Sequence, residues 1–190
     1  ANYELGRYEL ARSIVDTAVE LRPERADLYY TAGLIALALD DKVAARTNFE
    51  KAIALREQFP EARNNLGVIY QEARDYAGAE EQFKQAIRDY PDFKEAYLNL
   101  GNAYKGATKY KDAELAFKKA IGIDEQFADA HYNLGILYLD GDVPGIEPID
   151  RLQKAIDAFN AYKDVARGIV PKDDPVDKYI EEAKKAIEVE

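Results

Sequence analysis

The sequence predicts an all-α protein built as a solenoid of stacked helical hairpins. The first observation is a period of 34 residues that four residue series share. The four series are Gly33, Gly67, Gly101 and Gly135; Phe59, Phe93 and Phe127; Ala45, Ala79 and Ala113; and Phe49, Phe83 and Phe117. The second observation is that apolar residues recur three and four positions apart within 61–73 and 76–90, which is typical of amphipathic helices. Because one hairpin cannot bury its own apolar face, consecutive hairpins are expected to stack.

Each repeat is predicted to contain two helices, with a glycine where they approach most closely. Gly67 and its equivalents fall in the middle of the first helix, where glycine costs about 1 kcal/mol relative to alanine. A cost that recurs in every repeat requires a recurring reason, and a close approach of two helices supplies one. The small residues Ala79 and Ala113 of the second helix favour the same interpretation. Short breaks at 74–75 and 108–109 then join the helices into antiparallel hairpins.

Two repeats carry a recognisable motif, NNLGVIYQEARDYAGAEEQFKQAI (64–87) and LNLGNAYKGATKYKDAELAFKKAI (98–121). Their L-G-x2-Y and A-x3-F elements resemble the tetratricopeptide repeat family over about residues 1–165. The resemblance implies a right-handed superhelix whose first helices line a concave groove. The sequence departs from the family at the position of its first large aromatic residue and in its prolines. The residues concerned are Tyr29, Arg63, Tyr97 and His131 at the aromatic position, and only Pro23 and Pro91 at the proline position. His131 is therefore assigned to packing and not to catalysis.

The register divides the chain, expected to be one domain over 1–190, into repeats. The expected segments are a partial repeat at 1–25, full repeats at 26–59, 60–93 and 94–127, a repeat with an insertion at 128–168, and a capping helix at 174–189. Only second-helix positions are present in the partial repeat. We therefore expect that the parent protein continues before Ala1 or that another surface covers this end. The absence of methionine also suggests a trimmed domain or mature fragment.

An eight-residue insertion interrupts the fourth full repeat, where twelve residues, Asp140–Arg151, stand in place of the four that the register expects. It contains two prolines and two glycines, so we expect a turn-rich loop and no extra helix. Its acidic residues are Asp140, Asp142, Glu147 and Asp150. They lack the regular oxygen spacing, central glycine and final glutamate of a calcium loop, so we assign them to helix capping and solvation.

A last amphipathic helix is predicted after the segment VPKDDP. Asp174 suits its N-cap and Pro175 its first turn. Its apolar stripe is Val176, Ile180, Ala183 and Ile187. This composition indicates a cap that solvates the end of the solenoid. The alternative is a helix that is swapped into the groove of a neighbouring molecule.

Composition narrows the possible functions. The 190 residues include 26 basic and 36 acidic ones, a formal net charge of −10. Negative charge repels phosphate backbones, so nucleic acid is not an expected partner. Cysteine is absent, Ser13 is the only serine and His131 the only histidine, which leaves no nucleophile–base constellation. We expect no enzymatic activity, no catalytic residues, no metal and no cofactor.

The compartment stays open between the cytoplasm and the bacterial periplasm. No stretch approaches the roughly 18 apolar residues of a membrane span, and no signal peptide is recognisable, so direct membrane insertion is not expected. The segment PIDRLQKAIDAFNAYKDVAR (148–167) is similar to bacterial envelope tetratricopeptide repeat proteins, including lipoproteins linked to gliding motility. This resemblance implies a periplasmic multiprotein machine.

The family resemblance places candidate ligand contacts on the groove face of the first helices. The candidates are an asparagine ladder of Asn65, Asn99 and Asn133, an acidic row of Asp27, Glu61, Glu95 and Asp129, and the side chains of Tyr30, Leu98, Tyr132, Asn102 and Lys105. Asparagine both donates and accepts hydrogen bonds, so the ladder could bind an extended peptide backbone. Alternatively, the asparagines brace neighbouring helices and the acids solvate helix starts.

These features predict a binding module that recruits a basic or amphipathic segment of a partner protein into the groove. Some members of the family bind the C-terminal carboxylate of a partner through Lys, Asn and Arg in the groove. Such a clamp is not expected here, because the matching positions hold Tyr30, Asn64 and Leu98 beside acidic residues. Two other functions remain open. The chain could be a scaffold that self-associates through its ends, or an accessory domain of a larger enzyme.

Overall fold

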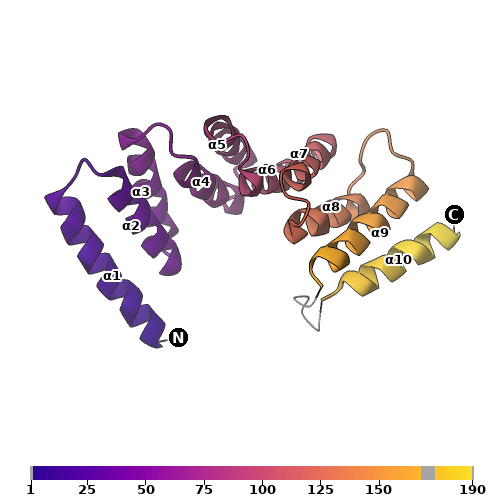
Figure 1. Ribbon diagram of the computed structural model, residues 1–190, viewed down its shortest axis with the longest axis horizontal. Helices are drawn as coiled ribbons and strands as arrows, with labels where there is room; N and C mark the ends of the chain where they lie inside the picture. Colours follow the sequence, from indigo (N-terminus) through magenta and orange to yellow (C-terminus); the bar gives the residue numbers. More distant parts are fainter. Residues whose placement is uncertain (1, 168–173, 190) are drawn as a thin grey trace. The chain divides into compact units, whose positions relative to one another are not determined.

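The computed structural model describes residues 2–167 and 174–189, and within them the chain is helical without strands (Figure 1). The helices are α1 (Asn2–Leu21), α2 (Ala26–Ala38), α3 (Lys42–Leu55), α4 (Pro60–Glu72), α5 (Tyr76–Asp89), α6 (Lys94–Gly106), α7 (Tyr110–Ile123), α8 (Ala128–Asp140), α9 (Pro148–Val165) and α10 (Val176–Val189). The predicted all-α class is confirmed. The chain forms two compact units, Ala1–Pro91 and Asp92–Glu190, and each is described by itself.

The hairpins α2–α3, α4–α5 and α6–α7 close with the same turn. In each, one residue adopts a left-handed conformation, namely Asp40 (φ 58°), Arg74 (φ 60°) and Thr108 (φ 59°). The following N–H donates to the carbonyl five residues earlier, as from Asp75 to Tyr70 at 2.9 Å. This is the Schellman motif, which satisfies carbonyl groups at the helix end. The 34-residue spacing of these turns explains why the hairpins recur in register.

The recurring glycines lie against the recurring phenylalanines of the partner helix. A Cβ on Gly33, Gly67, Gly101 or Gly135 would lie 2.4–2.6 Å from Cε1 of Phe49, Phe83, Phe117 or Phe159, respectively. All four phenylalanine side chains are fully buried. The first and second helices of each repeat can therefore approach only where the first helix has no side chain, as the sequence predicts.

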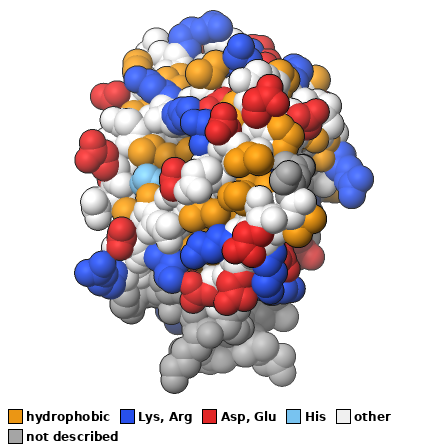
Figure 2. All heavy atoms as spheres, turned by 90° about the vertical axis from the view of Figure 1, so that its right-hand side faces the viewer, with side chains coloured by type: hydrophobic (Ala, Val, Ile, Leu, Met, Phe, Trp, Pro, Cys, Tyr) orange, Lys and Arg blue, Asp and Glu red, His pale blue; other side chains and the backbone are white. Residues whose placement is uncertain are grey.

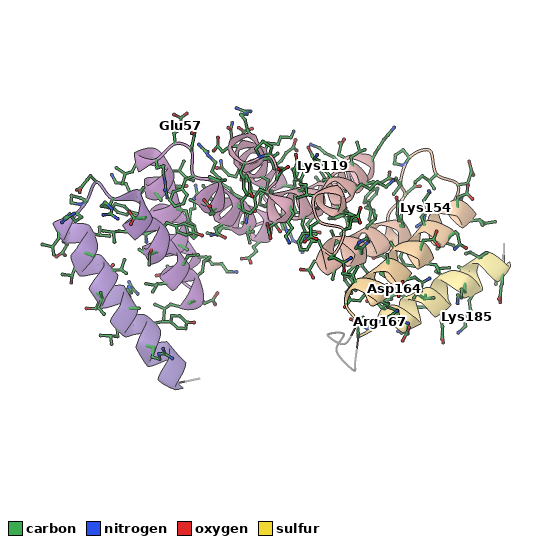
Figure 3. All side chains as sticks on the ribbon, viewed as in Figure 1. Glu57, Lys119, Lys154, Asp164, Arg167 and Lys185 are labelled. Atoms are coloured by element: carbon green, nitrogen blue, oxygen red, sulfur yellow. The ribbon has the colours of Figure 1, made fainter. Side chains whose placement is uncertain are left out.

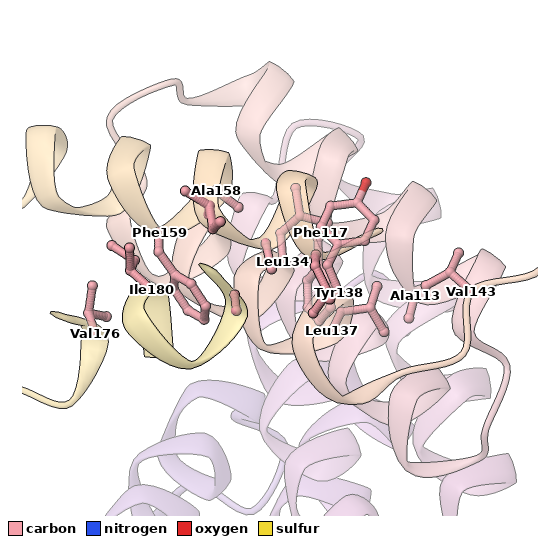
Figure 4. Close-up of a cluster of buried hydrophobic side chains, with 14 residues drawn as sticks. Ala113, Phe117, Leu134, Leu137, Tyr138, Val143, Ala158, Phe159, Val176 and Ile180 are labelled. Atoms are coloured by element: carbon pink, nitrogen blue, oxygen red, sulfur yellow. The ribbon is translucent and has the colours of Figure 1, made fainter. Parts of the chain in front are cut away.

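In the unit Asp92–Glu190, one apolar cluster joins α7, α8, α9 and α10 (Figure 4). Phe159 of α9 packs beside Tyr179 of α10, with ring centroids 5.6 Å apart. Val176 and Ile180 of α10 are 2% and 7% exposed. Asp174 lies at the predicted cap, where its Oδ1 accepts from the N–H of Val176 at 2.9 Å. α10 thus covers the apolar side of α9.

The insertion in this unit is only partly a loop. α8 ends at Asp140 and α9 begins at Pro148, so the last four residues of the predicted loop, 148–151, form an additional helical turn. Proline favours the first turn of a helix, which explains this correction. Arg151 of that turn donates to the carbonyls of Tyr138 and Leu139, where it caps the end of α8. Val143, 1% exposed, anchors the remaining loop, 141–147.

In the unit Ala1–Pro91, α1 packs against α2 without burying any side chain of residues 6–21. Val15 of α1 occupies the register position of the buried Phe49. Ala32 and Ala36 of α2 occupy the positions of Leu66 and Tyr70. These smaller side chains line a cavity of about 90 Å³ between α1, α2 and α3. The N-terminal layer of this unit is therefore more loosely packed than the following hairpin.

Candidate functional site

Within each unit, we call residues 5, 9 and 12 of the repeats, counted from residues 26, 60, 94 and 128, the first-helix surface of that unit. The structure leaves these residues partly covered. The set is Tyr30, Leu34 and Leu37 on α2, Asn64, Val68 and Gln71 on α4, Leu98, Asn102 and Lys105 on α6, and Tyr132, Ile136 and Leu139 on α8. All are intermediate in exposure except Leu34, which is 40% exposed. Side chains that are half-buried keep apolar area available for a ligand.

In the unit Ala1–Pro91, the aromatic member of this surface is Tyr30. Its ring lies 4.9 Å from that of Phe59 and 5.8 Å from that of Phe49, centroid to centroid. Burial raises the pKa of Tyr30. Asn65 Nδ2 donates to Tyr30 Oη at 3.3 Å, which links α4 to α2. Asn65 therefore braces neighbouring helices here, as the second interpretation of the asparagine ladder expects.

In the unit Asp92–Glu190, the same surface is more apolar. Leu98, Tyr132, Ile136 and Leu139 all pack from outside against one core cluster. The helices α6 and α8 that carry them are in contact. Lys105 lies among them, and burial lowers its pKa while the negative charge of Asp140 opposes that effect. This surface can offer apolar contacts together with a partly desolvated ammonium group.

The asparagine ladder is partly engaged within the protein. Asn133 Nδ2 donates to the carbonyl of Asp129 on its own helix at 2.7 Å. Each side-chain amide has two donor hydrogens and an acceptor oxygen, so Asn133 and Asn65 retain further hydrogen-bonding capacity. Bracing and peptide binding are therefore compatible for the ladder.

The acidic row divides into one paired and three exposed carboxylates. Arg25 donates to Asp27 at 2.6 Å, and this hydrogen bond lowers the pKa of Asp27. The sequence pattern does not predict this pairing. The signal that could have suggested it is that Arg25 stands two residues before Asp27, at the start of a helix. Glu61, Glu95 and Asp129 are exposed. Those three are the members available to a cationic ligand.

A tyrosine pair on α8 and α9 also borders this surface. The rings of Tyr132 and Tyr162 are 5.3 Å apart and meet edge to face. Tyr162 Oη donates to Asp174 Oδ2 at 2.6 Å, which raises the pKa of Tyr162 to about 12. The sequence pattern assigns Asp174 to capping and does not predict a contact with Tyr162. Only the structure brings them to the edge of the first-helix surface.

Among residues 2–167 and 174–189, no three His, Asp or Glu side chains are grouped as metal ligands. His131 Nε2 lies 3.0 Å from the carbonyl oxygen of Glu125. Acidic and basic side chains are interspersed on the face shown in Figure 2. No helix in the described part of the chain is long and apolar enough to cross a membrane.

Comparison with solved structures identifies the fold. PilW, a widely conserved type IV pilus biogenesis factor, superposes with a TM-score of 0.79 and 21% identity over 99% of this chain and 86% of its own. YrrB, a protein with an unusual peptide-binding site, superposes with a TM-score of 0.70 and 22% identity over 96% of this chain and 86% of its own. MamA from Desulfovibrio magneticus RS-1 superposes with a TM-score of 0.74 and 22% identity over 85% of this chain and 87% of its own. No curated protein matches the sequence.

The family pattern described as tetratricopeptide repeat matches the sequence four times, over residues 1–63, 30–92, 64–126 and 98–173. These matches cover most of the chain. They agree with the hairpins, the Gly–Phe contacts and the common turn described above. The chain therefore belongs to the tetratricopeptide repeat family.

Proposed function

We propose that this protein is a non-catalytic module that holds a peptide or helical segment of a partner protein on its first-helix surface, within a multiprotein assembly. Tetratricopeptide repeat proteins are in general interaction modules without catalysis. The observation that carries the proposal is the composition of this surface. Apolar side chains that are largely half-buried make up most of it, amides lie among them on α4 and α6, and exposed carboxylates lie at the starts of α4, α6 and α8.

The apolar part of the surface supplies affinity. Leu98, Ile136 and Leu139 already pack on the core with one side and expose the other. Covering exposed apolar area contributes about 25 cal/mol per Å². Because helices hold these side chains, binding orders few of the protein's own groups. An amphipathic helix or an extended apolar segment matches such a surface.

The acidic row sets the expected charge of the partner. Glu61, Glu95 and Asp129 are exposed, and the chain carries a net charge of −10. Opposite charge steers association and disfavours acidic competitors. We therefore propose a basic or amphipathic partner segment. The description of YrrB as a peptide-binding protein supports a peptide ligand for this fold.

The test is binding to an array of random peptides, comparing the wild-type protein with Glu95→Lys/Asp129→Lys. Both changes are at exposed positions, so the fold should tolerate them. The matched control is Glu57→Lys/Glu181→Lys, which alters the net charge equally at exposed positions outside this surface; Glu57 is labelled in Figure 3. We expect the wild-type and control proteins to select Lys- and Arg-containing peptides and the first variant to lose at least about tenfold in affinity.

Two results would contradict the proposal. Equal losses in both variants would show that only net charge matters, and the absence of peptide selection would remove the ligand altogether. The ladder is tested separately with Asn65→Ala, Asn99→Ala and Asn133→Ala combined, after circular dichroism shows an unchanged fold. If peptide affinity is then unchanged, the asparagines only brace helices.

A further inference from the structure

The outer side of α1 carries an exposed apolar stripe. Leu10, Ile14 and Leu21 are 63%, 61% and 74% exposed. At 3.6 residues per turn they lie within about 40° of one another around the helix. Single exposed apolar residues are ordinary on protein surfaces, whereas a contiguous stripe marks an interaction site more often.

The repeat register shows that this stripe lies where second helices normally meet a neighbour. The equivalents of Leu10 and Ile14 in α3 are Ala44 and Asn48. Both line the cavity that α3 shares with α1, so this face of α3 receives the preceding second helix. The same face of α1 therefore corresponds to a helix-docking position.

Two other repeats support the same assignment. Ala158, the equivalent of Ile14 in α9, is 7% exposed and belongs to a core cluster with Phe117. Asp89, the equivalent of Leu21 in α5, lies 3.5 Å from Arg63 on the first helix of its own repeat. The positions of Ile14 and Leu21, which are covered in α9 and α5 respectively, thus carry large apolar side chains in α1 and are open there.

The other terminal helix, α10, does not share this feature. Its apolar side packs on α9, where Ala183 is fully buried. Its exposed residues are Asp177, Lys178, Glu181, Glu182, Lys184, Lys185 and Glu188, together with Ala186 and Val189. A mostly charged outer face is typical of a capping helix, whereas the outer face of α1 lacks that character.

A second set of acidic residues, which we call the α1 acidic row, lies beside the stripe and indicates the charge of the occupant. Its members are Glu9 and Glu20, which are exposed and lie within about 20° of each other, about 110° from the stripe. Asp16 is not one of them, because it lies 4.0 Å from Arg12 and lines the cavity between α1, α2 and α3. Only the small residues Ser13 and Thr17 separate the two rows. A helix docked on the stripe would place its flanking side chains next to these carboxylates.

We propose that the outer face of α1 docks an amphipathic helix of a partner protein. The apolar stripe of that helix covers Leu10, Ile14 and Leu21, and its flanking Lys or Arg side chains contact the α1 acidic row. A second copy of this chain fits less well. Antiparallel two-fold pairing of α1 with itself brings the same edge of each helix together, so the two α1 acidic rows would adjoin. The net charge of −10 adds to that repulsion.

The test uses two labelled synthetic helices as probes, one with a leucine stripe flanked by lysines and one with glutamates in place of the lysines. Binding is measured by fluorescence anisotropy in the Glu95→Lys/Asp129→Lys background, in which we expect basic-peptide binding at the first-helix surface to be at least about tenfold weaker. The variants are Leu10→Gln/Ile14→Gln and Glu9→Gln/Glu20→Gln. The control is Val43→Gln/Leu115→Gln, at apolar positions that are 79% and 60% exposed.

We expect the lysine probe to bind the background protein and the control, and to bind the stripe variant at least about tenfold more weakly. The Glu9→Gln/Glu20→Gln variant should weaken the lysine probe severalfold and reduce its preference over the glutamate probe. Equal binding to the stripe variant and the control overturns the proposal. So does sedimentation that shows a wild-type dimer which the stripe variant converts to monomer, because a second copy would then occupy the face.

Discussion

Replacing Gly101 by alanine should destabilise the protein, although alanine is the better helix former. In an exposed helix the substitution contributes about 1 kcal/mol of stability. At position 101, however, the new Cβ would lie 2.4 Å from Cε1, 2.6 Å from Cδ1 and 2.9 Å from Cζ of Phe117. These distances are shorter than real carbon contacts, so the ring or a helix must move.

The size of the effect follows from the surroundings of Phe117. Its side chain is fully buried, so the ring has no solvent-facing position to adopt. Overpacking a buried site costs about 1–3 kcal/mol, and the enclosed ring places this site at the upper end. After the gain in helix propensity is subtracted, we expect a net destabilisation of about 1–2 kcal/mol.

Gly122→Ala is the matched control in the same unit. Gly122 lies in α7 and is exposed, and a Cβ at this position would meet no neighbouring atom within 4 Å. This variant should gain up to about 1 kcal/mol. The assay is urea unfolding followed by far-ultraviolet circular dichroism, with both variants and the wild-type protein under the same conditions.

A double-mutant cycle identifies the contact responsible. Phe117→Leu removes the ring atoms that clash and leaves a hole when made alone. Combined with Gly101→Ala, the new methyl group should fill part of that hole, so the two effects should fall short of additivity by at least about 1 kcal/mol. If Gly101→Ala were as stable as Gly122→Ala, or the two effects were additive, the close-approach argument would be refuted.

Three further predictions concern the turns and one hydrogen bond. Thr108→Gly should raise stability by about 0.5–1 kcal/mol in urea unfolding, because a β-branched residue is unfavourable at φ 59°. Lys109→Asp should add about 0.5–1 kcal/mol in the same assay, since Asp75 at the equivalent position caps its helix through the N–H of Gly78. The raised pKa of Tyr162 means that the folded state holds its proton longer, so this stabilisation is present below pH 10 and is lost as the pH rises from about 10 to about 12. Tyr162→Phe, which cannot donate to Asp174, should lose less stability than the wild-type protein over that pH range in thermal unfolding.

Much of the fold was accessible from the sequence because the repeat uses local signals. Helical periodicity depends on residues within one helix, and the 34-residue series compares equivalent residues of successive hairpins. The insertion shows how far this reasoning extends. Gly135 and Phe159 are 24 residues apart, whereas Gly101 and Phe117 are 16 apart, yet both pairs make the same contact. The sequence placed the eight extra residues, but it did not show that four of them extend α9.

The candidate site was less predictable, because side-chain partners across helices are not encoded by spacing alone. The sequence placed Asn65 and Tyr30 on the same kind of surface, and only the structure shows the hydrogen bond between them. The same holds for Tyr162, whose partner Asp174 lies beyond the end of its helix.

By itself, then, the sequence determined the class of the protein, its repeat length and the close helix approach at the glycines, since each follows from residue size and helical period. That a phenylalanine ring of the second helix lies against each of these glycines came only from the structure. Tertiary structure decided which polar groups are already engaged and which apolar faces stay open. Leu10 and Ile14 illustrate the difference: their register predicts a neighbouring helix, but their exposure of 63% and 61% depends on what packs against α1. The burial of a side chain depends on which elements pack against it, and a local sequence pattern does not specify those elements.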